Sequence, residues 1–367
     1  MIRNLVFIFL IGGLSFGFIL IARNQPSGNQ FPPVPDNQTA EIIKPKIEKL
    51  IWTPATTTAP WSTRDAATTF IWQDKLWLTG GLNGRQAIAN NVPYWELPHF
   101  NDVWSTVDGS NWREETVRAA WPARRSMSII PFAGKLWLLG GWSPISGYGS
   151  DIWTSLDGVE WIKEKNQATF PPREGQVVIE FKNQLWLMGG VEFDQHQTYN
   201  DVWTSIDGLN WTLATSSAPW SSRYDHAVAV FNNKLWLIGG VKLGDIGKSD
   251  IWSSIDGISW TLETDQVPWG KRHGHALVEW PALIGSGKHN KLWLVSGWDT
   301  DKNDGANDVW SSVDGKNWKA ETPAPWRGRE DHAAVIFKND LWLFSGMDGD
   351  WRWRNDLWRG QLVETEE

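Results

Sequence analysis

The chain has 367 residues and no cysteine, which excludes a disulfide framework, thiolate metal sites and thiol catalysis. Its formal net charge is −8, and acidic and basic residues are mixed without a basic stripe, so nucleic-acid binding has no support. The 30 tryptophans recur at regular intervals, which indicates internal repeats.

Residues 1–22 predict a membrane-targeting segment, because 18 apolar or small residues without a charge follow the single basic Arg3 and Asn4. Such a run is either a signal peptide or a membrane-spanning anchor. Ala22 is small but Leu20 is not, which favours a retained anchor over a cleaved signal. The protein is expected outside the cytoplasm, membrane-anchored, or secreted if cleavage occurs. Residues 23–45 are rich in proline and polar residues and predict an extended linker.

Each repeat contains four short apolar runs typical of strands. The first run begins at an arginine, and the second is Leu-Trp-Leu followed by Gly-Gly or Ser-Gly. The third begins at an aspartate, and the fourth follows an Asp-Gly hairpin signal and ends at a tryptophan. The arginines are Arg64, Arg124, Arg173, Arg223, Arg272 and Arg329. The aspartates are Asp102, Asp151, Asp201, Asp250, Asp308 and Asp356. One arginine for each aspartate favours structural pairing over a ring for anionic ligands.

Four antiparallel strands per repeat predict an all-β, six-bladed β-propeller over residues 46–362, with an acidic tail at 363–367. The sixth repeat lacks its Asp-Gly and final tryptophan. The segment around Trp52 matches that missing fourth strand, so the N-terminal strand is expected to close the ring. Closure removes exposed strand edges.

The repeat resembles the kelch repeat. Arg223 and His226, Gly239-Gly240, Asp250 and Trp260 carry the likeness. It implies the fold and leaves the function open, since kelch propellers serve as enzymes and as binding platforms. Histidine also stands at 275 and 332, where packing is favoured over metal binding, whereas the first three repeats have Ala67, Met127 and Gln176. A weaker likeness joins 312–318 to the aspartate box of sialidase propellers, which is a structural turn.

Strand alternation places the loops after each second strand on one face with the blade connections. Twenty-five tryptophans fit the repeat, and five fall in these loops: Trp95, Trp142, Trp298, Trp351 and Trp353. Together with Arg352 they are the predicted ligand-binding residues, because function concentrates in loops on a rigid scaffold. The alternative is that the longest loop, 82–100, plugs the channel and buries some of them.

The residue that follows each repeating arginine differs from repeat to repeat, and it is expected at the rim of the channel. The residues there are Asp65, Arg125, Glu174, Tyr224, His273 and Glu330, with Asp225 and Asp331 one position further. A weak likeness to a calcium loop at Asp299, Asp301 and Asp304 lacks the final glutamate, so a solvated acidic turn is favoured and no metal or cofactor is expected.

Two function classes remain open. The favoured one is a monomeric, non-catalytic propeller that binds a carbohydrate or a protein on its loop face. The alternative is a carbohydrate-active enzyme resembling bacterial propellers that mutarotate sialic acid, with Glu174, Glu330, His273 and Arg125 as acid, base and anion clamp. Galactose-oxidase-like chemistry is disfavoured because its crosslinked tyrosine needs a cysteine.

Overall fold

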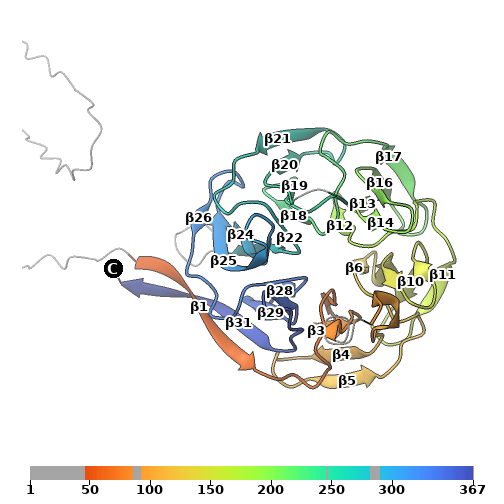
Figure 1. Ribbon diagram of the computed structural model, residues 1–367, viewed down its shortest axis with the longest axis horizontal. Helices are drawn as coiled ribbons and strands as arrows, with labels where there is room; N and C mark the ends of the chain where they lie inside the picture. Colours follow the sequence, from red (N-terminus) through yellow and green to blue (C-terminus); the bar gives the residue numbers. More distant parts are fainter. Residues whose placement is uncertain (1–45, 86–91, 245–246, 282–289, 367) are drawn as a thin grey trace, which may run out of the picture. The chain divides into compact units, whose positions relative to one another are not determined.

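Six antiparallel sheets surround a central channel in the computed structural model, which describes residues 46–85, 92–244, 247–281 and 290–366 (Figure 1). The strand order within each sheet follows the chain from the channel outward, except in the last sheet. The predicted all-β, six-bladed propeller is confirmed. The described residues include one 3-10 turn, η1 (Tyr94–Glu96).

The blades repeat one four-strand plan with little variation. The first three are β2 (Thr68–Trp72), β3 (Lys75–Thr79), β4 (Val103–Thr106) and β5 (Arg113–Thr116); β6 (Ser128–Phe132), β7 (Lys135–Leu139), β10 (Ile152–Ser155) and β11 (Ile162–Lys165); and β12 (Val177–Phe181), β13 (Gln184–Met188), β16 (Val202–Ser205) and β17 (Thr212–Thr215). The next two are β18 (Ala227–Phe231), β19 (Lys234–Ile238), β20 (Ile251–Ser254) and β21 (Trp260–Thr264); and β23 (Ala276–Pro281), β24 (Asn290–Asp299), β25 (Asp304–Ser312) and β26 (Lys319–Ala320).

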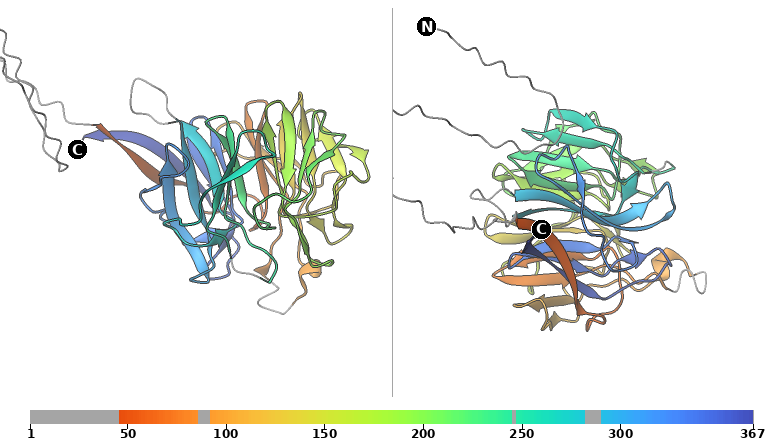
Figure 2. Two further views of the ribbon diagram at one scale, coloured as in Figure 1. Left: turned by 90° about the horizontal axis from the view of Figure 1, so that it is seen from above. Right: turned by 90° about the vertical axis from the view of Figure 1, so that its left-hand side faces the viewer.

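The sixth blade combines β28 (Ala333–Phe337), β29 (Asp340–Phe344) and β31 (Leu357–Glu366) with β1 (Lys46–Thr56) as its outer strand. β1 pairs antiparallel with β31 from Lys46 opposite Glu366 to Thr56 opposite Leu357. The far ends of both strands project together from the rim (Figures 1 and 2). Trp52 of β1 packs edge-on against Trp326 at 4.7 Å, as Trp61 packs on Trp112 in the first blade.

Each repeating arginine is buried and binds its blade aspartate with two hydrogen bonds, so the predicted pairing is confirmed. Arg173 donates to both carboxylate oxygens of Asp201 at 2.6 and 2.9 Å, and to the carbonyl of Gly189 at 2.9 Å. The same aspartate accepts the indole N–H of Trp203 at 2.7 Å. This unit ties the entry of each blade to its second and third strands.

Neighbouring blades meet where a Leu-Trp-Leu tryptophan covers the glycine of the next blade's Asp-Gly turn. A Cβ at Gly208 would lie 2.6 Å from the Trp137 ring, and one at Gly257 would lie 2.5 Å from Trp186. Both glycines have positive φ. The turn therefore needs glycine for its backbone and for the contact between blades.

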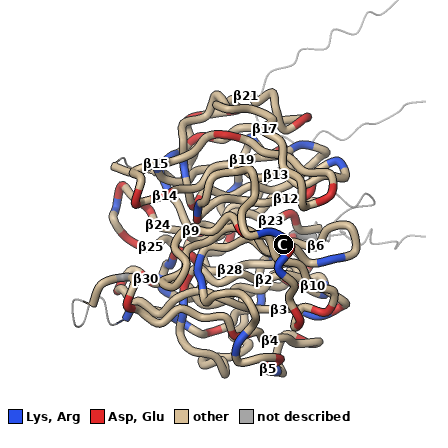
Figure 3. The backbone as a smooth tube through the Cα atoms, turned by 90° about the vertical axis from the view of Figure 1, so that its right-hand side faces the viewer, with Lys and Arg blue, Asp and Glu red and all other residues tan. Residues whose placement is uncertain are grey.

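Charged residues of both signs are mixed over the surface (Figure 3).

The predicted membrane segment and linker at 1–45 lie outside the described residues. Within the described part of the chain, no helix has the length and apolarity that crossing a bilayer requires.

Candidate functional site

A ring of backbone hydrogen bonds narrows the channel. In each blade, the second residue after the repeating arginine has a left-handed φ between 49° and 64°. Its N–H donates to the carbonyl of its counterpart in the preceding blade, and five such links of 2.8 to 3.1 Å join described residues. The ring residues are Ala66, Ser126, Gly175, Asp225, Gly274 and Asp331.

A cavity of about 430 Å³ opens above this ring on the loop face. Every lining residue belongs either to a segment entering a blade or to a loop after a second strand. Two glycines of the ring make room for acidic side chains, because a Cβ at Gly175 would lie 2.7 Å from Asp225 Oδ1 and one at Gly274 would lie 2.8 Å from Asp331 Oδ1. The sequence thus places both carboxyl groups at the cavity floor.

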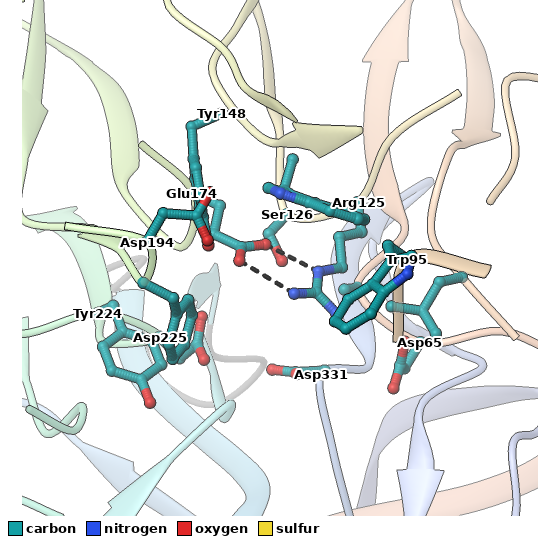
Figure 4. Close-up of a pocket in the computed structure, with 14 residues that line it drawn as sticks. Asp65, Trp95, Arg125, Ser126, Tyr148, Glu174, Asp194, Tyr224, Asp225 and Asp331 are labelled. Carbon is teal, nitrogen blue, oxygen red and sulfur yellow. Dashed lines mark hydrogen bonds and ion pairs between the residues drawn. The ribbon is translucent and has the colours of Figure 1, made fainter. Parts of the chain in front are cut away.

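Arg125 and Glu174 form the central ion pair of the cavity. Arg125 Nε donates to Glu174 Oε2 at 2.8 Å, and Nη2 donates to Oε1 at 3.0 Å (Figure 4). The guanidinium carbon also lies 5.3 Å from the centre of the Trp142 ring. Arg125 and Glu174 were both among the residues predicted to act as acid, base or anion clamp. The structure brings them together as an ion pair, so that the charge of each is balanced by the other.

Asp65 lies opposite, at the entry to the first blade, and is 4% exposed. Its Oδ2 accepts the indole N–H of Trp353 at 2.7 Å, while its Oδ1 has no hydrogen-bond partner among the described residues. Burial, aided by the charge of Asp331 and opposed by Arg125, raises the pKa of Asp65 to about 8. Asp65 therefore holds a proton at neutral pH.

The pKa values of the two floor carboxyl groups, on Asp225 and Asp331, are also raised. Burial raises the pKa of Asp331 to about 6, with Arg125 opposing the rise and Glu174 adding to it. Burial and the charges of Asp331 and Glu174 raise the pKa of Asp225 well above its usual value. The cavity therefore collects carboxyl groups that resist simultaneous ionisation.

His273 and Glu330, the other two candidates for catalysis, lie beside the cavity and are not part of its lining. His273 Nδ1 and Glu330 Oε2 are 3.1 Å apart, yet neither atom makes a directed hydrogen bond within the described structure. Burial lowers the pKa of His273 to about 4, and burial with the nearby aspartates raises that of Glu330. A neutral imidazole facing a protonated carboxyl fits these directions.

The five loop tryptophans do not form one exposed patch. Trp95 is 63% exposed and Trp142 is half-buried, and both line the cavity. Trp351 is 51% exposed away from the lining. Trp298 and Trp353 are each 6% exposed and pack with Met347, because loops from adjacent blades close over them. Arg352 is exposed next to them. Loop 82–100 contributes Leu82 and Trp95 to the cavity wall, and residues 86–91 lie outside the described residues.

The sequence did not single out three further wall residues, Tyr148, Phe193 and Ser126. Tyr148 lies on β9 (Gly147–Tyr148), opposite Trp142 of β8 (Trp142–Ser143). The signal that could have found it is the six-residue spacing of two aromatics around Gly147, which suits a short hairpin. Phe193 packs edge-on against Tyr224 at 5.4 Å.

A second cavity of about 180 Å³ lies on the other side of the backbone ring and shares Asp225 and Asp331 with the first. It is lined by the histidines of the last three repeats, His226, His275 and His332, whose pKa values burial lowers. Each of the three is buried. They are neutral packing groups at neutral pH.

The acidic turn considered for calcium has protein partners instead. Asp299 accepts the backbone N–H groups of Asp301 and Lys302 at 3.1 Å and the Lys302 ammonium at 2.6 Å. Asp301 lies 3.4 Å from Lys271, and Asp304 lies 2.7 Å from Arg327.

The fold and the site define a six-bladed β-propeller with an acidic, aromatic-walled cavity at one mouth of its channel. No family model and no curated protein matches the sequence. Among the solved structures that do match, one described as "Structure of YjhT" has a TM-score of 0.62 at 13% identity. The match covers 85% of this chain and 100% of that chain. At this identity the similarity shows the fold alone.

Proposed function

We propose that the protein is a kelch-like propeller, tethered outside the cytoplasm by residues 1–22, whose channel-mouth cavity binds a small carbohydrate. The observation that carries this proposal is the combination of aromatic walls with buried carboxyl groups in one cavity of about 430 Å³. Small-molecule sites are concave, mostly apolar and furnished with a few converging polar groups.

The chemistry of a sugar suits these walls. Its ring faces carry C–H groups that pack on Trp95 and Trp142, while its hydroxyls donate to carboxylates and accept from protonated carboxyl groups. Asp65 offers both an unpartnered oxygen and a proton at neutral pH. An anionic sugar fits less well, because Arg125 is already bound by Glu174.

Titration calorimetry with a panel of monosaccharides tests the proposal. Trp142→Ala is expected to weaken binding at least tenfold, because it removes a wall of the cavity. Trp351→Ala is the matched control, since it deletes an exposed loop tryptophan that does not line the cavity, and its affinity should equal that of the parent. Equal binding by the parent and Trp142→Ala would place the ligand elsewhere.

A second candidate is a carbohydrate-active enzyme that transfers protons, such as a mutarotase-like epimerase. It is favoured by the presence of Asp65, protonated at neutral pH, in the same cavity as the Arg125–Glu174 ion pair, because a proton-transfer enzyme needs an acid and a second carboxyl group within reach of one substrate. Anomer exchange followed by NMR should then slow at least 100-fold in Glu174→Gln while binding persists. An exchange rate equal to that without protein would leave binding as the function.

A further inference from the structure

The cavity has a marked excess of acidic groups. Among the described residues, five carboxyl groups and a single guanidinium line it. Four of the carboxyl groups belong to Asp65, Glu174, Asp225 and Asp331, and the fifth, on Asp194, is exposed at the margin. The one guanidinium, on Arg125, donates two hydrogen bonds to Glu174. Three acidic residues at the floor and far wall therefore face the cavity without a basic partner of their own.

One carboxyl oxygen at the wall lacks a hydrogen-bond partner. The Asp65 residue is only 4% exposed. Its Oδ1 makes no hydrogen bond to the described residues, whereas its Oδ2 accepts the indole N–H of Trp353. A buried polar atom without a hydrogen-bond partner destabilises the fold. A ligand that brings an ammonium group to this atom supplies the missing partner and favours the ionised carboxylate, and Asp331 lines the same cavity (Figure 4).

The aromatic walls favour the same kind of ligand. Trp95, Trp142, Tyr148 and Tyr224 surround the cavity, and aromatic ring faces attract cations within about 6 Å. Arg125 already uses this interaction, with its guanidinium carbon 5.3 Å from the Trp142 ring centre. Carboxyl groups and ring faces together form a cage for an organic cation.

We propose that the ligand of this cavity carries a positively charged amine, so that the proposed carbohydrate is an amino sugar. This inference rests on the proposed carbohydrate-binding function and names its substrate class. An organic cation is favoured over a metal ion, because within the described residues no three or more His, Cys, Asp or Glu side chains are arranged to hold a metal.

Binding of an amine should release protons. A cation beside Asp65 and Asp331 stabilises their ionised forms, and burial otherwise raises their pKa values to about 8 and about 6. The other titratable or charged groups that face or adjoin the cavity are Arg125, Glu174, Asp194, Tyr148, Tyr224 and Asp225, with His273 and Glu330 beside it. Calorimetry in buffers of different ionisation enthalpy measures this release directly.

The test compares glucosamine, which is charged, with glucose and N-acetylglucosamine, which are neutral, on the full chain at pH 7. The parent is expected to bind glucosamine at least tenfold more tightly than either neutral sugar and to release protons on binding. Asp65→Asn and Asp331→Asn should each reduce that preference to less than threefold. Asparagine at 65 can still accept from Trp353, and at 331 it tolerates the left-handed backbone.

Asp74→Asn is the charge-matched control, because Asp74 is an exposed aspartate in the turn at the opposite end of β2 from Asp65. It should keep the full preference. Equal affinities for glucose and glucosamine in the parent would overturn the charged ligand while leaving the carbohydrate proposal standing. Binding of tetramethylammonium, weakened by Asp65→Asn, without binding of any sugar would keep the cation cage and reject the carbohydrate. Binding of neither class would reject both.

Discussion

The indole N–H of Trp353, in the loop after the second strand of the sixth blade, donates to Asp65 of the first blade at 2.7 Å. The bond crosses the boundary between the two ends of the repeat array and fixes the Asp65 carboxyl group, which lines the channel-mouth cavity. Trp353 was predicted to contact a ligand, but it is only 6% exposed and is not among the residues that line the cavity. Its role is to orient Asp65.

Replacing Trp353 with phenylalanine should therefore destabilise the fold. The change removes the indole donor from Oδ2 of Asp65, whose Oδ1 already has no hydrogen-bond partner among the described residues, and the loss of this buried bond costs about 1–3 kcal/mol. Urea denaturation measures the loss. Trp351→Phe, at a position 51% exposed, should change the unfolding free energy by less than about 0.5 kcal/mol. An equal effect of both changes would mean that the Asp65 bond contributes nothing.

The two glycines Gly208 and Gly134 separate backbone strain from blade packing. Their φ angles are 76° and 75°, so alanine meets the same strained backbone at both. A Cβ at Gly208 lies 2.6 Å from Trp137, whereas one at Gly134 meets nothing within 4 Å. Gly208→Ala should cost about 1–3 kcal/mol more than Gly134→Ala, as expected for overpacking. Equal melting temperatures of the two variants would show that the contact between the blades accommodates the added methyl group without loss of stability.

The buried arginine–aspartate pairs should be far more sensitive than exposed ones. Asp201→Asn leaves the fully buried Arg173 without its counter-charge, and breaking such a pair costs about 3–5 kcal/mol. Asp350→Asn at the Arg327 contact of 3.6 Å, where both side chains are exposed, should cost less than about 1 kcal/mol. Chemical denaturation of both variants against the parent checks the difference. Similar values would argue that the repeated pair sets blade geometry without adding stability.

The sequence predicts the contacts of residues that recur in every repeat, but it does not predict how the loops pack. Every Arg–Asp pair could be predicted, because one arginine and one aspartate recur in each of the six repeats and leave each arginine a partner of its own, and the pairs are found. The rim residues Arg125 and Glu174 could be named because they break the repeat. The burial of Trp298 could not be foreseen, because Met347 and Trp353 cover it from a loop about 50 residues further along the chain. Loop packing across blades has no repeat to reveal it.

The pH dependence of stability should expose Asp65. Its folded pKa, raised by burial to about 8, exceeds the usual value of 3.8, so its contribution is full below about pH 4 and is lost as the pH rises through 8. Between pH 6.5 and 9 this loss is about 2 kcal/mol. Asp65→Asn does not titrate, so its stability relative to the parent should improve by that amount over the range.

The comparison with Asp65→Asn also separates Asp65 from other groups, because Asp225 and Glu330, whose pKa values burial also raises, are present in both proteins. The buried histidines, whose pKa values burial lowers, weaken the fold only as the pH falls below about 6.5, and Asp331 titrates at about 6. Asp74→Asn provides the exposed control and should track the parent from pH 6.5 to 9. A constant difference between Asp65→Asn and the parent across this range would contradict the raised pKa of Asp65.

Removal of residues 46–60 should prevent cooperative folding. Strand β1 pairs with β31 from Lys46 to Thr56, and Trp52 fills the place that other blades give to the last tryptophan of their own repeat. Without β1, the sixth blade would expose an unpaired strand edge and the face of Trp326. The deletion variant is expected to lose its sharp thermal transition by circular dichroism, whereas a deletion of 363–367 should retain it. A 46–60 deletion that melts cooperatively at the parent temperature would show that the propeller does not need its N-terminal strand.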